Sequence, residues 1–191
     1  MNRKSFSGAA SRSPGFTLIE LLVTMLIGGI LVAIAVPAFN SFVLNDRDIG
    51  EVNSLVSSFN YARNEAVKLN NGGITVCTSV SGTACDGGTN WGGGWIVKDN
   101  LGNPPLQYVP PFVASNTANA TVTSPSPTQI TFSSTGQVFA PGLPSATIQI
   151  DVCDPRGASH ARDVEVNPAG RVAATQTVGK NVAGTAALTC P

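Results

Sequence analysis

The most distinctive chemical group in the sequence is the carboxylate of Glu20, which stands directly before a long apolar run. The run covers Leu21 to Phe39, nineteen residues without a formal charge, enough for a helix to cross a bilayer. A carboxylate in lipid is unfavourable by a few kcal/mol, so we expect Glu20 to be functional and paired. A Gly15–Phe16 junction precedes the run, whereas a secretory signal has its cleavage site after the apolar region. These residues indicate more than a plain membrane anchor.

Four cysteines, all located after the apolar run, form the second chemical group: Cys77, Cys85, Cys153 and Cys190. An even number on the side that would face an oxidising compartment predicts disulfides, with three possible connectivities. We favour Cys77 with Cys85, a short local loop, and Cys153 with Cys190, which would hold the C-terminus. Zinc is the competing interpretation, but it needs closely spaced ligand pairs, and the single histidine, His160, has no such partner. No metal is expected.

Other polar residues could be imagined as a hydrolase constellation: Asp151, Asp154, Ser159, His160 and Asp163. No nucleophile-elbow sequence surrounds the serine, and adjacent Ser159 and His160 in a loop are not expected to face each other. The glycine-rich segment Trp91–Trp95 lacks the Gly-Lys-Ser/Thr ending of a phosphate-binding loop and precedes a strand, not a helix. Packing of the two tryptophans is favoured over sugar stacking. We expect neither catalysis nor a cofactor.

The charge balance separates the first fifteen residues from the rest of the chain. The formal net charge is zero, but Arg3, Lys4 and Arg12 lie before Phe16, so removing residues 1–15 leaves eight basic and eleven acidic side chains. A mildly acidic remainder argues against a general electrostatic attraction for nucleic acid. Charged residues make up 12% of the chain and Gly and Pro are frequent, which is typical of an extracytoplasmic, loop-rich β domain. The three cations predict a cytoplasmic N-terminus.

One long helix, residues 16–71, is predicted to position Glu20. Residues 16–39 are apolar on all sides, and residues 40–71 are amphipathic. Apolar residues recur there at three- and four-residue steps: Ile49, Val52, Leu55, Val56, Phe59, Ala62, Ala66 and Val67. Charged residues are expected mostly on other faces: Asp46, Arg47, Asp48, Glu51, Arg63, Glu65 and Lys68. Pro37 is expected to kink or loosen the helix, and Asn70–Gly73 to end it with a left-handed cap.

The chain after the helix is predicted to be an antiparallel β domain. The expected strands are residues 74–77, 95–99, 106–109, 121–123, 129–132, 147–152, 163–166 and 171–173. Asn167–Gly170 is a hairpin turn between the last two strands. Several strands alternate apolar and polar residues, so one face of the sheet is expected to be buried by the amphipathic half of the helix.

The segment Ser13-Pro14-Gly15-Phe16-Thr17-Leu18-Ile19-Glu20 resembles the processing site of type IV pilins and of the pseudopilins of type II secretion. The later chain resembles the GspH/FimT group within this superfamily. The motifs that carry this resemblance are Tyr61–Ala66, Ile74–Cys77, Trp91, Gly94–Val97 with Asp99, Phe132–Gly136 and Gly170–Val172.

The resemblance implies specific roles for the N-terminal residues. A prepilin peptidase would cut after Gly15 and N-methylate Phe16. Glu20 would pair with the N-terminal ammonium of Phe16 on a neighbouring subunit and fix the register of the filament, since burial leaves an unpaired carboxylate penalised. A glutamate that merely extends to the membrane interface is the alternative.

The resemblance also raises a question about DNA. FimT proteins that bind DNA carry a C-terminal Gly-Arg-x-Arg pattern, whereas this chain has Gly170-Arg171-Val172-Ala173 and lacks the second arginine. A phosphate-contacting patch would have to come from Arg156, Arg162, Arg171 and Lys180. Four charges on an acidic protein would give weak, salt-sensitive binding, so solvated loop charges are the favoured interpretation.

The sequence therefore predicts an α+β, pilin-like fold in which a long transmembrane and amphipathic helix packs on a C-terminal antiparallel β-sheet domain. The expected organisation is a removed leader (1–15), a helix (16–71; 16–39 in the filament core) and a periplasmic domain (72–191). The expected function is that of a non-enzymatic minor pilin or pseudopilin of the bacterial inner membrane. Its expected partners are the prepilin peptidase, other pilins and inner-membrane lipid. A DNA-binding pilin for natural transformation is the alternative.

Overall fold

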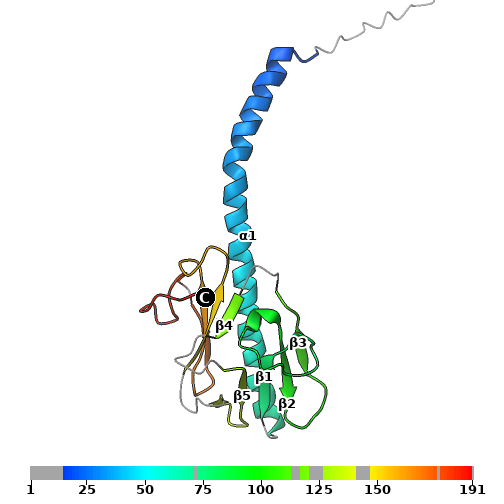
Figure 1. Cartoon of the computed structure of the whole chain (residues 1–191), viewed down its shortest axis with the longest axis vertical. Helices are drawn as coiled ribbons and strands as arrows, with labels where there is room; N and C mark the ends of the chain where they lie inside the picture. Colours follow the sequence, from blue (N-terminus) through cyan, green and yellow to red (C-terminus); the bar gives the residue numbers. More distant parts are fainter. Residues whose placement is uncertain are drawn as a thin grey trace, which may run out of the picture. The chain divides into compact units, whose positions relative to one another are not determined.

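A computed structural model of the chain describes residues 15–70, 73–112, 117–120, 127–140, 147–175 and 177–190, with side chains omitted at 117–120. The chain divides into two compact units, Met1–Phe42 and Val43–Pro191. The first unit contains the beginning of a long helix, and the second contains the rest of that helix and all the strands (Figure 1).

The helix α1 covers Leu18–Leu69, a length of 52 residues. Pro37 has no amide hydrogen to donate, yet the helix continues through it, and the Ser41 hydroxyl donates to the Pro37 carbonyl at 3.3 Å. The helix is therefore one element from Leu18 to Leu69, as predicted, and a kink or loosening at Pro37 stays a prediction. At the other end, Asn70 has a φ of +47°, the left-handed conformation that commonly follows the last turn of a helix. The predicted stop signal is in the predicted place.

The strands after the helix form two antiparallel sheets, whereas the strand pattern in the sequence did not distinguish two sheets from one. The five-stranded sheet has the order β3 (Gln107–Val109), β2 (Trp95–Asp99), β1 (Ile74–Thr78), β5 (Gln129–Phe132) and β6 (Val138–Phe139). The four-stranded sheet has the order β4 (Thr117–Ala120), β7 (Ile148–Cys153), β8 (Arg162–Val166) and β9 (Val172–Ala174). Neither β4 nor β6 was predicted, and the strand predicted at 121–123 lies outside the described residues.

The second half of α1 packs against both sheets within the second unit (Figure 1). Phe59 lies at the centre: its ring is 5.7 Å from that of Trp91, in the 3₁₀ helix η1 (Trp91–Gly93), and 6.4 Å from that of Phe132. The same core includes Ile150 and Val164 of the four-stranded sheet. Because residues of α1 and of both sheets share this core, the helix supports both sheets. Apolar surface buried in this way contributes about 25 cal/mol per Å².

The buried face of α1 differs from the predicted one at its edges. Its buried residues are Asp48, Glu51, Val52, Leu55, Ser58, Phe59, Ala62 and Ala66. Ile49 and Val67, predicted to face the core, are 40% and 51% exposed. Asp48 and Glu51, predicted to lie mostly on other faces, are fully buried. The helical spacing of the buried residues was predicted correctly, but the buried face of α1 is rotated about the helix axis, so that it includes Asp48 and Glu51. Buried carboxylates of this kind need polar partners in the β domain.

Candidate functional site

The N-terminal site begins with a helix cap at Thr17. The backbone N–H of Glu20 donates to Thr17 Oγ1 at 3.3 Å, and that of Leu21 donates to the Thr17 carbonyl at 3.2 Å. Thr17 and Glu20 thus have the Ser/Thr-x-x-Glu spacing of a capping box, and the Glu20 carboxylate lies in the first turn, near the positive end of the helix dipole. The Thr-x-x-Glu spacing of this cap is present in the sequence, but the cap was not predicted.

The apolar surface that follows is exposed on every side of the helix. Phe16 is 81% exposed, and large apolar residues from Leu18 to Phe39 are about half exposed or more. The helix is long and apolar enough to cross a membrane by length and composition. A contiguous apolar surface of this size requires lipid or other helices as its cover. Gly15 and Phe16 therefore lie directly before an apolar segment that has no cover within its own unit.

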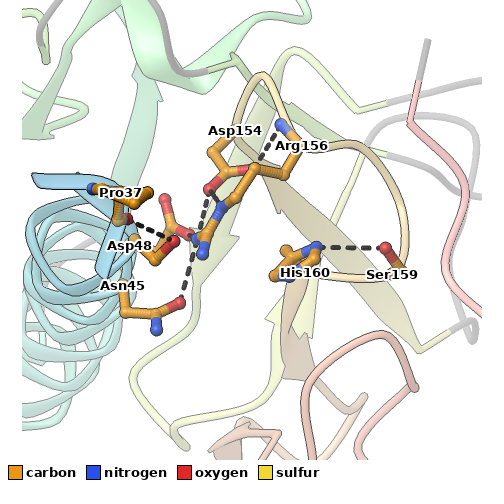
Figure 2. Close-up of polar contacts among 8 residues, drawn as sticks. Pro37, Asn45, Asp48, Asp154, Arg156, Ser159 and His160 are labelled. Carbon is orange, nitrogen blue, oxygen red and sulfur yellow. Dashed lines mark hydrogen bonds and ion pairs between the residues drawn. The ribbon is translucent and has the colours of Figure 1, made fainter. Parts of the chain in front are cut away.

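An ion-pair cluster joins α1 to the β7–β8 loop inside the second unit (Figure 2). The Arg156 guanidinium donates to Asn45 Oδ1 at 2.9 Å, lies 3.3 Å from Asp48 Oδ2 and forms a close ion pair with Asp154. The Asp154 carboxylate also accepts from the Arg156 backbone N–H at 2.8 Å. Burial raises the pKa of Asp48 to about 6; the Asp154 charge raises it as well, and the Arg156 charge opposes both.

Arg162 also faces the core side of the four-stranded sheet. It pairs in register with Val152, whose side chain is fully buried in the core. The Arg162 side chain is only partly exposed, and its Nε is buried without a hydrogen-bond partner among the described residues. Arg162 also contributes to the electrostatic balance at Asp48 by lowering the pKa of that carboxyl. Arg156 is therefore not the solvated loop charge that was favoured, because its guanidinium is mostly buried and paired with two carboxylates, whereas Arg162 stays partly exposed.

Arg171 and Lys180, the other two residues considered for DNA, are exposed. The Arg171 backbone N–H donates to Asn167 Oδ1 at 2.9 Å, which fixes the start of β9. No ion pair is recorded for either side chain within the described part of the chain. The structure therefore does not bring the four cations together as one exposed patch.

Both favoured disulfides are present. Cys77 is bonded to Cys85, and Cys153 to Cys190, with Cα–Cα separations of 5.6 and 5.9 Å. The first closes the loop of residues 77–85. Asp86, directly after this loop, accepts from the Thr78 hydroxyl and from the Gly88 backbone N–H, and these bonds lower the pKa of Asp86. The second joins the end of β7 to the C-terminal segment.

Three of the short motifs that carried the family resemblance meet at one point. Arg63 Nε, on α1, donates to the Gly136 carbonyl at 3.3 Å. A Cβ placed on Gly170, where φ is +76°, would lie 1.9 Å from the same carbonyl oxygen. The neighbouring turns are also joined by the Val138 N–H, which donates to the Pro168 carbonyl at 2.9 Å. The motifs thus fix the junction of the helix with turns from both sheets.

The tryptophans and the imagined hydrolase residues make contacts within the β domain or with α1. Trp91 and Trp95 are fully buried, and Trp91 packs on Phe59, as predicted. The expectation for Ser159 and His160 was wrong, because Ser159 Oγ lies 3.0 Å from His160 Nδ1 (Figure 2). Asp154, however, is paired with Arg156 (Figure 2). Another aspartate of the imagined constellation, Asp163, accepts from the Val182 N–H at 3.0 Å.

The fold and the N-terminal site together define a pilin-like protein. In the described fold, the chain resembles the type IV minor pilin FimU of Pseudomonas aeruginosa, with a TM-score of 0.52 and 22% identity over 71% of this chain and 98% of that one. Residues 51–170 match the family model described as type II transport protein GspH, and residues 10–36 match the prokaryotic N-terminal methylation motif. The chain belongs to the GspH family.

A curated relative agrees with this assignment. The type IV narrow pilus major component PilA5 of Thermus thermophilus is 36% identical over 91 residues, which are 47% of this chain and 74% of PilA5. The resemblance inferred from the sequence is thereby confirmed for the pilin superfamily and for the GspH group. The matches to the family model and to PilA5 do not support the DNA-binding alternative.

Proposed function

We propose that this chain is a minor pilin or pseudopilin that is processed between Gly15 and Phe16, methylated on Phe16 and assembled into a filament through residues 16–39. The observation that carries the proposal is the exposed apolar half of α1, which begins two residues after Phe16 within the matched methylation motif. In a filament, equivalent helices from neighbouring subunits would provide its cover.

Membrane insertion would precede assembly. Arg3, Lys4 and Arg12 favour retention of the N-terminus in the cytoplasm, which directs the β domain to the periplasm. Two disulfides in the β domain are consistent with an oxidising compartment. In this proposal the chain consists of a leader (residues 1–15), a helix (16–71) and a periplasmic domain (72–191). The protein would thus be anchored in the inner membrane before it enters a type IV pilus or a secretion pseudopilus.

Glu20 would fix the position of each subunit by pairing with the Phe16 ammonium of its neighbour. A carboxylate placed among apolar helices is stabilised only by a partner charge, so subunits shifted along the filament would leave it unpaired. The bond at Thr17 uses the Glu20 backbone N–H, but the capping-box spacing would also allow the Glu20 side chain to accept from the Thr17 N–H, a second, local role that an assembly experiment has to separate from the first.

Two substitutions separate these roles. Glutamine can replace glutamate in a capping box but carries no charge, whereas alanine removes both functions. We expect Glu20→Gln and Glu20→Ala to be inserted and processed normally but to be absent from sheared filaments or pseudopili, as judged by immunoblotting. Wild-type incorporation of Glu20→Gln together with loss of Glu20→Ala would show that Glu20 acts as a cap and not through its charge.

A further inference from the structure

The four-stranded sheet ends in an open strand edge at β9. β9 pairs with β8 on one side only. The Asn167 N–H donates to the Arg171 carbonyl and the Thr175 N–H donates to the Asp163 carbonyl, so the backbone at Arg171 and Thr175 faces β8. Because antiparallel pairing alternates every residue, the N–H and C=O groups of Val172 and Ala174 point to the open edge. Val172 and Ala174 thus offer their N–H donors and C=O acceptors for backbone hydrogen bonds to an additional strand.

A groove of about 570 Å³ lies along this edge. One wall is the segment from Arg171 to Thr175, and the other includes Thr177, Val182 and Gly184. The size is within the range of ligand-binding pockets, and β9 itself contains neither a proline nor a charge that would block pairing. The groove is therefore suited to an extended chain.

The second wall is held in place before any ligand arrives. Asp163 Oδ2 accepts from the Val182 N–H at 3.0 Å, and the Asn181 side chain accepts from the N–H groups of Thr185 and Ala186 at 2.9 and 3.1 Å. Beyond these bonds, Cys190 is tied to Cys153. A preformed groove avoids part of the ordering cost of binding.

The charge of the groove selects the chemistry of its ligand. Arg171 lines it and is exposed, and exposed Lys180 belongs to the segment that forms the second wall. No carboxylate is found among the described lining residues. One or two cations beside an unpaired strand edge favour an acidic peptide over a nucleic acid, which requires several phosphate contacts.

We propose that this groove binds an extended acidic peptide segment of another filament subunit by adding it as a further strand beside β9. Backbone bonds to Val172 and Ala174 provide the affinity, and Arg171 selects a carboxylate-bearing side chain. The assignment of the segment to a filament subunit rests on the proposed function. The binding test below requires no filament, so either inference can fail without the other.

The test uses the full mature chain in detergent micelles and a fluorescein-labelled eight-residue peptide of alternating valine and glutamate. Fluorescence anisotropy should show saturable binding and at least tenfold weaker binding of a valine–lysine peptide. Hydrogen exchange should slow at the amides of Val172 and Ala174 when the peptide is bound. A peptide with N-methylated backbone amides should bind at least tenfold more weakly, and equal binding would refute strand addition without any change to the protein.

Variants of the protein give a second test. Ala174→Pro removes an outward N–H while leaving the ladder to β8 intact, and should weaken peptide binding at least tenfold. Arg171→Glu should weaken it similarly, whereas Lys98→Ala, on β2 of the other sheet, should stay within twofold of wild type. Wild-type affinity in folded Ala174→Pro, or displacement of the peptide by short duplex DNA at low micromolar concentration, would overturn the proposal.

Discussion

Substitution of Gly170 by alanine tests the junction between the helix and the two sheets. An alanine Cβ would lie 1.9 Å from the Gly136 carbonyl oxygen and 3.0 Å from Arg63 Nε, so the two turns must separate by about 1 Å or more. That movement would break the bonds from Arg63 to Gly136 and from Val138 to Pro168. We add about 1 kcal/mol for alanine at positive φ, about 1–3 for overpacking and about 1 for each lost bond.

The expected loss of unfolding free energy is therefore roughly 4–6 kcal/mol for Gly170→Ala. The matched control is Gly102→Ala: Gly102 also has a positive φ, +86°, but a Cβ there meets nothing within 4 Å, so only about 1 kcal/mol is expected. Urea unfolding of the full chain in detergent, followed by the fluorescence of buried Trp91 and Trp95, gives both values. Unfolding free energies that agree within about 1 kcal/mol for the two variants would refute the steric reasoning.

Three further predictions concern buried charges and the C-terminal disulfide. Arg156→Ala leaves two buried carboxylates without their cation and should cost about 3–5 kcal/mol in urea unfolding; Asp48→Ala, which leaves Arg156 paired with Asp154, should cost less, and the reverse order would contradict the cluster. Burial raises the pKa of Asp163 to about 7 from an ordinary value of 3.8, so its contribution to stability is present below about pH 4 and is lost as pH rises through 7. The thermal midpoint of Asp163→Asn should therefore fall less than that of wild type between pH 5 and pH 8, and equal slopes would disprove it. Replacing Cys153 and Cys190 together by serine should cost about 2–4 kcal/mol and weaken peptide binding in the β9 groove; unchanged urea unfolding and unchanged affinity would contradict this.

Local sequence was sufficient for most of the elements. The extent of α1, its end at Asn70 and the hairpin at Asn167–Gly170 depend on residues adjacent in the chain, and all were predicted. The Thr17 cap belongs to the same class, since it depends on the Thr-x-x-Glu spacing of adjacent residues, although it was not predicted. Such features need no knowledge of the rest of the fold.

Features decided by distant residues could not be predicted in this way. Asp48 is buried because Arg156, 108 positions later, meets it, so helical periodicity alone assigned its carboxylate to another face. The same long-range pairing changes Arg156 from a candidate surface cation into part of the core boundary. The division of the strands between two sheets, and the meeting of Gly136 with Gly170, likewise follow from tertiary contacts that no local pattern encodes.

The bond between Cys153 and Cys190 has a consequence for how the domain tolerates proteolysis. Its partners are 37 positions apart, and the segment between them contains β8, β9 and both walls of the groove. That segment is therefore a covalent ring. A protease that cuts one exposed peptide bond within it, for example next to Thr185, opens the ring but releases no fragment. Both walls of the groove would stay joined through the disulfide after a single cut.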